Sequence, residues 1–177
     1  LRFEYNRSLD AFLDRLPIGA SILELGCGDG RDAAHMEARG FAVDATDGVA
    51  GMAALASHRL GKPARVMMFD ELDQHDAYDA VWASSSLLHV SLADLPDVLA
   101  RVHRALRLDG WHWASYKGGE GEGRDEFARF FNYLSRTQLE SAYSTGGEWA
   151  ELVIEEGMGS SFGGRPTPWL NVTARKR

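Results

Sequence analysis

The fold follows from one segment, Ile22-Leu23-Glu24-Leu25-Gly26-Cys27-Gly28-Asp29-Gly30-Arg31-Asp32. Its apolar start is typical of a short strand that is covered on both faces. The three glycines at alternate positions allow a sharp turn and leave bare peptide against which a ligand can lie. Asp29 and Asp32 suit the N-terminus of a following helix. The segment therefore predicts a strand, a turn and a helix that bind a nucleoside-containing ligand at the carboxyl end of the strand.

Three interpretations of the glycine-rich turn compete. The dinucleotide fingerprint G-x-G-x-x-G needs its third glycine where Arg31 stands, but the third glycine here comes one residue earlier, at Gly30. A tight connection between strand and helix that binds no ligand is the second interpretation. The third follows from the spacing Glu24-x-Gly26-x-Gly28-x-Gly30, which resembles motif I of the class I S-adenosylmethionine (SAM) dependent methyltransferases.

Apolar periodicity repeats the alternation of strand and helix along the chain. Strands are expected at residues 21–25, 41–47, 64–69, 78–83, 111–116, 149–155 and 168–175. Helices are expected at residues 8–16, 30–39, 48–60 and 94–107, and from the capping box Ser135-x-x-Gln138 to about residue 146. We expect one domain over residues 1–177, with an α/β fold: a Rossmann-like, seven-stranded, mainly parallel sheet with helices on both faces and an antiparallel C-terminal hairpin.

Residues 117–134 interrupt this alternation. Four glycines fall within Lys117–Gly123, so residues 117–125 are expected to form a mobile loop in the absence of ligand. The aromatic stretch after it, residues 127–133, is expected to be helical and to pack against the fold. Two interpretations stay open: a lid over an acceptor pocket, or a surface connector in front of a core helix.

Composition limits the possible partners. The net charge of −7 and the pI of about 5.3 argue against a nucleic-acid phosphate track, which needs a basic face. The chain contains no apolar run of the roughly 18 residues that a membrane-spanning helix needs. Its single cysteine, Cys27, suits a reducing compartment. We therefore expect a cytoplasmic protein, a monomer or homodimer, with no nucleic-acid or membrane partner.

The methyltransferase resemblance covers about residues 20–117 in the right order. Tyr78-Asp79-Ala80-Val81-Trp82-Ala83-Ser84-Ser85-Ser86-Leu87-Leu88-His89 is similar to the family's fourth strand and the loop after it. Arg107-Leu108-Asp109-Gly110-Trp111 is similar to the turn before its fifth strand, although Leu108 and Trp111 depart from that pattern. Within the family, Gly28–Asp32 and Trp169–Lys176 resemble the small tellurite-resistance-type group.

The resemblance implies SAM as methyl donor, S-adenosylhomocysteine (SAH) as product, and a set of binding residues. The glycine turn would line the methionine and ribose of SAM, and Asp47 would accept the ribose hydroxyls. Asp44 is an alternative acid, but it lies in the middle of a strand, and Met52 could equally be a core residue. The expected cofactor-binding residues are Glu24, Gly26, Cys27, Gly28, Gly30, Arg31, Asp47, Gly48, Met52, Asp70, Glu71, Leu72, Ser84 and Ser85.

Residues on the acceptor side are chosen by their place after strands four and five. His89 and Tyr116 are the candidate catalytic residues, because either could exchange a proton with an acceptor atom. A structural role is the alternative for His89, and solvated surface positions are the alternative for the charged candidates. The expected acceptor-binding residues are His89, Tyr116, Lys117, Arg129, Tyr133 and Arg165. No cluster of His, Cys or Asp has metal-ligand spacing, so no metal is expected.

These observations predict a SAM-dependent methyltransferase that acts on a small-molecule acceptor by in-line displacement. An NAD(P)-dependent oxidoreductase is the first alternative, weakened by Arg31 and by the lack of a Tyr-x-x-x-Lys pair. A non-catalytic SAM-binding module is the second. Whether the acceptor atom is O, N, S or a metalloid does not follow from the sequence.

Overall fold

The computed structural model describes residues 2–125, 127–160 and 164–177, with side chains from residue 7 onward. The helices are α1 (Arg2–Leu13), α2 (Arg31–Ala38), α3 (Ala50–Leu60), α4 (Leu95–Ala105) and α5 (Arg136–Gly146), with short 3₁₀ turns η1 (Phe69–Glu71) and η2 (Leu87–His89). The strands are β1 (Ser21–Leu25), β2 (Ala42–Asp47), β3 (Arg65–Val66), β4 (Tyr78–Ala83), β5 (Leu106–Gly118), β6 (Gly121–Arg124), β7 (Phe130–Leu134), β8 (Trp149–Ser160) and β9 (Pro166–Lys176).

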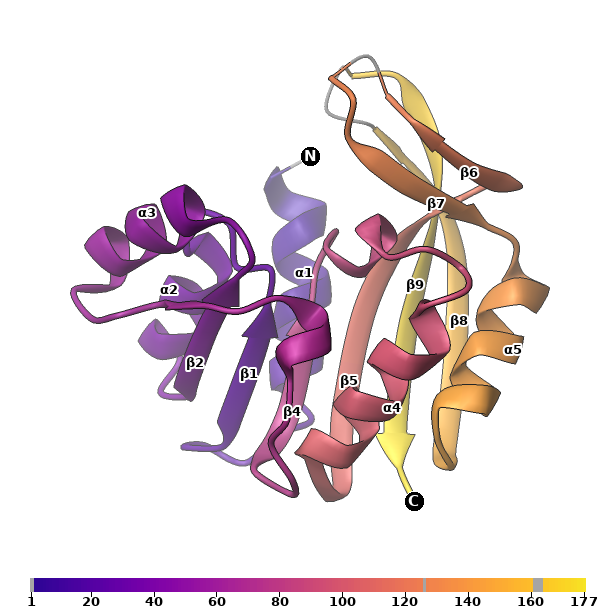
Figure 1. Ribbon diagram of the computed structural model, residues 1–177. Coiled ribbons are helices and arrows are strands. Elements are labelled where there is room, and N and C mark those ends of the chain that lie inside the picture. Colours follow the sequence, from indigo (N-terminus) through magenta and orange to yellow (C-terminus); the bar gives the residue numbers. More distant parts are fainter. Residues whose placement is uncertain (1, 126, 161–163) are drawn as a thin grey trace.

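In the described residues these strands form one sheet of nine strands, and its order sets where a ligand can bind. The parallel part runs β3-β2-β1-β4-β5. Beyond it, β9 pairs antiparallel with β5 and also with β8, so β9 lies between them (Figure 1). The strand order reverses beside β1, between β1 and β4, which places a ligand crevice at the carboxyl ends of these strands.

The two faces of the sheet are covered by different helices because side chains alternate along each strand. On one face, Leu23 and Val81 belong to a core cluster with the buried faces of α4 and α5. On the other, Ile22 and Trp82 belong to a cluster with α1 and α2. Figure 1 shows α4 and α5 in front of the sheet and α1 behind it. The predicted α/β sandwich with helices on both faces and a C-terminal antiparallel hairpin is confirmed.

The segment around residues 117–134 is where the sequence prediction was wrong. β6 falls within the predicted mobile loop, and β7 replaces the predicted aromatic helix; the two pair as an antiparallel hairpin. The glycine-rich segment can form a strand because its backbone N–H and C=O groups pair with β7 as those of any residue would. Strand β7 in turn pairs in parallel with β5 at Lys117 and Gly118. The sheet therefore has two more strands than the seven expected.

Polar side chains tie this hairpin to the loop after β4. The Asn132 side chain is buried, and its Nδ2 donates to the carbonyl oxygens of Leu87 at 3.2 Å and Val90 at 2.6 Å. The Leu92 N–H donates to the Glu122 carboxylate. These hydrogen bonds satisfy the buried amide donor and fix β7 against the loop after β4.

The remaining differences are shifts in element bounds. The third strand shrinks to two residues, because the chain leaves the sheet after the Met67 N–H donates to Asp47 O at 3.1 Å. The last two strands are longer than predicted, because they pair with each other from Trp149 to Ser160 and from Pro166 to Lys176. The capping box at Ser135 and Gln138 is confirmed. Among the described residues, no helix combines the length and apolar composition needed to cross a membrane.

Candidate cofactor and acceptor site

The glycine turn after β1 has a backbone that other residues would strain. Gly26, Gly28 and Gly30 have φ angles of 76°, 56° and 79°, in the left-handed region. A Cβ on Gly26 would lie 2.4 Å from Ser86 Cβ, and a Cβ on Gly30 would lie 3.0 Å from Ala56 Cα. The turn is therefore held between the loop after β4 and helix α3, and neither position has room for a side chain.

Asp47, at the end of β2, holds this turn in place. Its Oδ2 accepts the Gly28 N–H at 2.9 Å, and its Oδ1 accepts the Val49 N–H at 2.8 Å. A carboxylate has about four acceptor positions, so both oxygens retain capacity for the hydroxyls of a ligand. The alternative acid, Asp44, is paired instead with Arg65 at 2.7 Å and with the Tyr78 hydroxyl.

Glu24 carries the least satisfied polar group near the turn. Its side chain is buried, the Ala33 N–H donates to its carboxylate, and Oε2 has no hydrogen-bond partner. Burial, and then the charge of Asp32, raises the pKa of Glu24 well above its ordinary value. An orphaned buried carboxylate oxygen beside a glycine turn fits a ligand that brings a cationic group, and SAM carries both a sulfonium and an ammonium.

The other expected cofactor residues are distributed around the same edge of the sheet. Met52 points toward the turn, since its Cε would lie 3.7 Å from a Cβ on Gly28. A Cβ on Gly48 would lie 2.7 Å from Met68 Sδ, so this position is closely packed. Cys27 is buried, and burial raises the pKa of its thiol to about 12. Arg31, in contrast, has a largely exposed side chain.

The residues after β3 have mixed roles. Asp70 and Glu71 lie in η1, where the Glu71 carboxylate accepts the Met68 N–H at 2.7 Å. The Leu72 side chain is fully buried in the core cluster, so only its backbone could meet a ligand. The assignment of an adenine site to these residues stays a prediction.

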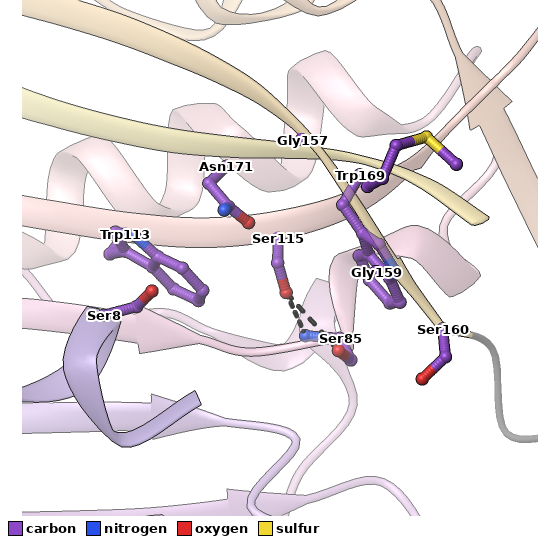
Figure 2. Close-up of a pocket in the computed structure, with 10 residues that line it drawn as sticks. Ser8, Ser85, Trp113, Ser115, Gly157, Gly159, Ser160, Trp169 and Asn171 are labelled. Atoms are coloured by element: carbon purple, nitrogen blue, oxygen red, sulfur yellow. Dashed lines mark hydrogen bonds between the residues drawn. The ribbon is translucent and has the colours of Figure 1, made fainter. Parts of the chain in front are cut away.

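A cavity of about 220 Å³ opens beside the loop after β4 (Figure 2). Ser85 lies at its edge, one residue after Ser84 and one before Ser86, whose Oγ donates to Leu25 O at 2.6 Å. The cavity therefore begins next to the residue that packs on Gly26. Its lining residues are Ser8, Ser85, Trp113, Ser115, Gly157, Met158, Gly159, Ser160, Trp169 and Asn171.

Ser85 is held in an unusual backbone conformation. Its φ of 52° is uncommon for a residue other than glycine, asparagine or aspartate. The Ser85 N–H donates to Ser115 Oγ at 2.8 Å, and the two hydroxyl oxygens are 3.4 Å apart. Strained residues concentrate where a loop must present a group to a ligand. The predicted cofactor-end residue Ser85 thus also reaches the cavity.

The predicted acceptor residues do not line this cavity. Tyr116 is wholly buried, with its hydroxyl 3.2 Å from the Tyr143 hydroxyl, and burial raises its pKa above the ordinary value. His89 has Nδ1 2.6 Å from Phe130 O, so it anchors the β6–β7 hairpin. The geometry favours packing roles for both, and their catalytic assignment remains untested.

The charged candidates surround the same hairpin. Lys117 Nζ lies 3.7 Å from the centre of the Phe131 ring, and Arg129 forms an ion pair with Asp125 at 2.6 Å. Tyr133 is half-buried in β7, and Arg165 is exposed. The structure therefore brings His89, Lys117 and Arg129 together, but around Phe131 rather than at the cavity.

Sequence reasoning missed the indoles and amide that form the cavity. Trp113 and Ser115 alternate on β5, and Trp169 and Asn171 alternate on β9, so each pair faces the same side of its strand. The register pairs Ser115 with Asn171, which brings the two pairs together. The alternation was visible in the sequence, but the pairing of these two strands, far apart in the chain, was not.

A comparison with known families decides the class. The sequence profile described as a methyltransferase domain matches residues 22–110. The chain belongs to this methyltransferase family. The match covers the glycine turn, Asp47, the loop at Ser85 and the turn at Gly110, so the class I SAM-dependent methyltransferase assignment is confirmed and the oxidoreductase alternative is set aside. No curated protein sequence matches the chain.

Solved structures with the same fold include several methyltransferases. A SAM-dependent methyltransferase from Methanosarcina mazei superposes with a TM-score of 0.79 at 16% identity, covering 94% of this chain and 96% of that one. The 1,6-didemethyltoxoflavin-N1-methyltransferase from Burkholderia thailandensis gives 0.77 at 23%, covering 96% and 76%. TehB from Haemophilus influenzae gives 0.75 at 14%, covering 96% and 62%. At these identities the likeness shows a shared fold.

Proposed function

We propose that this methyltransferase transfers a methyl group from SAM to a small-molecule acceptor that binds in the cavity between β5, β9 and α1. The observation that carries the proposal is the position of Ser85, which lines the cavity while its neighbour Ser86 packs against the glycine turn. A donor held by the turn and an acceptor held in the cavity would meet at this loop.

The residues of the chain fit SAM as the donor. The turn from Gly26 to Gly30 would receive its methionine and ribose, Asp47 would accept the ribose hydroxyls, and Glu24 would face its cationic end. When bound, SAM supplies a methyl group already activated by the sulfonium. The Burkholderia structure named above contains SAH, and a Haemonchus contortus phosphoethanolamine N-methyltransferase of the same fold contains SAM.

The chain itself would contribute mainly position and exclusion of water. In-line displacement needs the acceptor atom close behind the methyl group, and holding two reactants in that geometry lowers the barrier by several kcal/mol, roughly 7–11 in favourable cases. Ser85 and Ser115 would fix the reacting end of the acceptor through their hydroxyls. This positioning of the acceptor by two hydroxyls requires no charged general base.

The size and charge of the chain support a small acceptor in the cytoplasm. A cavity of about 220 Å³ suits a small molecule. The names of two neighbours of the same fold specify 1,6-didemethyltoxoflavin and phosphoethanolamine as what those enzymes methylate. With a net charge of −7 and a buried single cysteine, we also propose a cytoplasmic monomer or homodimer without a nucleic-acid partner.

Calorimetric titration of the full chain with SAH and, in parallel, NADH tests the donor. We expect SAH to bind in the micromolar range and NADH not to bind. The Gly28→Val variant should lose SAH binding, because its φ of 56° disfavours a branched residue and the side chain would occupy ligand space. A matched Gly51→Val change lies on α3 where an added Cβ meets nothing, and should retain SAH binding. NADH binding without SAH binding would overturn the proposal.

A further inference from the structure

We propose that the methyl acceptor is a planar aromatic or heteroaromatic molecule whose reacting end is uncharged, held between the indoles of Trp113 and Trp169. The inference rests on the proposed function and adds the chemical class of its substrate. Figure 2 shows the two indoles on opposite sides of the cavity, with Ser85 and Ser115 between them. Flat apolar walls with a few hydroxyls at one end select flat molecules that form hydrogen bonds at that end.

Trp113 forms a rigid wall. Its ring stacks on Trp82 with centroids 4.0 Å apart and planes 11° apart, and Trp82 in turn contacts Phe12 at 5.3 Å. Trp82 is fixed by the hydrogen bond from its Nε1 to Asp32 Oδ2 at 3.0 Å. Trp113 is 6% exposed, so the wall is preorganised, and an acceptor that contacts it restricts little side-chain freedom of the protein.

Trp169 forms the opposite wall because β8 leaves room for its indole. A Cβ on Gly159 would lie 2.8 Å from Trp169 Cδ1, so any larger residue at position 159 would displace the ring. Gly157, two residues earlier on the same face of β8, has open space where a Cβ would be. Gly159 thus lets the indole lie along β8 and border the cavity.

The polar groups of the cavity are uncharged. Ser8, Ser85 and Ser115 supply hydroxyls, and the Asn171 amide supplies one donor and one acceptor group. Among the described lining residues none is an acid, a lysine or an arginine. A phosphate, carboxylate or ammonium on the acceptor would lose its water here without gaining a counter-charge, which costs several kcal/mol in order of magnitude.

Charged side chains border a neighbouring cavity. A second cavity of about 190 Å³ shares Ser8, Trp113 and Asn171 with the first and is also bordered by Arg7, Arg15 and Glu155. An ionic substituent could therefore be tolerated at the end of the acceptor remote from Ser85. The reacting end, beside Ser85 and Ser115, remains restricted to neutral groups.

Calorimetric titration of the SAH-loaded full chain with four probes tests this class. The probes are 5-hydroxyindole and catechol as planar neutral molecules, cyclohexanol as a neutral but non-planar one, and phosphoethanolamine as a charged one. We expect 5-hydroxyindole or catechol to bind at least tenfold more tightly than the other two. Tighter binding of cyclohexanol or phosphoethanolamine, or no binding by either aromatic probe, would overturn the proposal.

Variants separate the walls of the cavity from the rest of the protein. Trp169→Leu should weaken binding of the preferred aromatic probe about tenfold, because stacking on the ring is lost. Gly159→Ala should weaken it through displacement of the same indole. Trp111→Leu is the matched control: Trp111 lies on the same face of β5 but packs against the Arg15 guanidinium, outside the cavity, and should leave probe binding unchanged.

SAH affinity of each variant keeps the two proposals distinguishable. A wild-type chain that fails to bind SAH contradicts the proposed function, whatever the probes do. Retained SAH affinity in Trp169→Leu and Gly159→Ala shows that these variants fold. With that affinity intact, unchanged binding of the aromatic probe in both variants would contradict the aromatic acceptor alone.

Discussion

At the scale of single residues, Asp47 joins the structure of the turn to ligand binding. We predict that Asp47→Ala weakens SAH binding by one to two orders of magnitude, roughly 1.5–3 kcal/mol, because charge-assisted hydrogen bonds are lost. Calorimetric titration measures the change. Asp44→Asn is the control, since Asp44 is committed to Arg65 and Tyr78 and should leave the affinity unchanged. Equal loss in both variants would mean that the effect comes from strand β2 and not from the ligand.

Glu24 should couple SAH binding to pH. Burial raises its pKa, so the folded chain retains a proton where an unfolded carboxyl has lost one. A cationic ligand beside Oε2 favours the ionised form, so the affinity for SAH should rise with pH. Glu24→Gln should weaken binding about tenfold and remove this pH dependence, while its amide oxygen can still accept the Ala33 N–H. Calorimetric titrations of wild type and variant with SAH at several pH values test this. If the SAH affinity of the Gln variant depended on pH as that of wild type does, Glu24 would not be the titrating group.

The same raised pKa has a consequence for stability. The folded state binds more protons than the unfolded state above the ordinary carboxyl pKa, so the contribution of Glu24 falls as pH rises through this range. The Gln variant carries no such proton. Its free energy of unfolding relative to wild type should therefore increase with pH, which urea titrations at pH 5 and pH 8 measure.

At the scale of secondary structure, the β6–β7 hairpin is the element whose role is open. If the hairpin acts as a lid, ligand binding must change the protection of its backbone amides from hydrogen exchange. None of its residues lines the cavity beside Ser85, and Asn132 fixes it to the loop after β4. We predict that amide hydrogen exchange in residues 117–125 slows when SAH and 5-hydroxyindole are bound. The reason is that the hairpin is fixed to the loop after β4, and this loop also carries Ser85. Equal exchange in both states would leave the hairpin as a static attachment of β5.

The elements also show what the sequence could and could not predict. Ile22 to Leu25 and Tyr78 to Ala83 were placed correctly, because fully buried parallel strands are apolar and short. Phe130 to Tyr133 was placed wrongly, because an aromatic run without clear alternation fits a helix or a strand and only the partner strand decides. The glycine turn was recognised by the spacing of its residues and Asp47 by its place at the end of the next strand, and their role in binding SAM stays a prediction. Trp169 and Asn171 were not, because their role depends on the register of β9 with β5.

At the scale of the whole molecule, the described side chains include no group of three His, Cys, Asp or Glu placed to hold a metal ion. We predict that methyl transfer to an acceptor survives dialysis against EDTA, since the sulfonium of SAM needs no Lewis acid. Assay of the dialysed chain with and without added Mg²⁺ or Zn²⁺ measures this. Activity that disappears on dialysis and returns with one of these ions would contradict the prediction.

The fold as a whole should lose stability in acid through His112. This ring is wholly buried, with Nδ1 3.1 Å from Val81 O and Nε2 3.0 Å from the Tyr143 hydroxyl. Burial lowers its pKa to about 4 from 6.5. An unfolded His takes up a proton below pH 6.5 and the folded one does not, so stability falls between pH 6.5 and 4, by about 3 kcal/mol in full.

Urea unfolding of wild type and His112→Gln at pH 7.5, 5.5 and 4.5 checks this prediction. The variant is expected to be less stable at pH 7.5, because the hydrogen bond to Tyr143 changes, but the difference should narrow as pH falls. Leu139→Ala provides the control, since it removes buried apolar contacts without changing a titratable group and should shift stability equally at each pH. A constant difference for His112→Gln would show that this ring does not titrate on unfolding.

The position of β9 has a consequence for how the protein is made. β9 fills the place between β5 and β8, although it is the last of these strands to leave the ribosome (Figure 1). Until residues 166–176 have emerged, one edge of β5 lacks its β9 partner, and its free backbone groups can pair with strands of other chains. Strands β1 to β4 are synthesised before the wall that carries Trp169 and Asn171. The residues proposed to bind the donor therefore leave the ribosome before those proposed to select the acceptor.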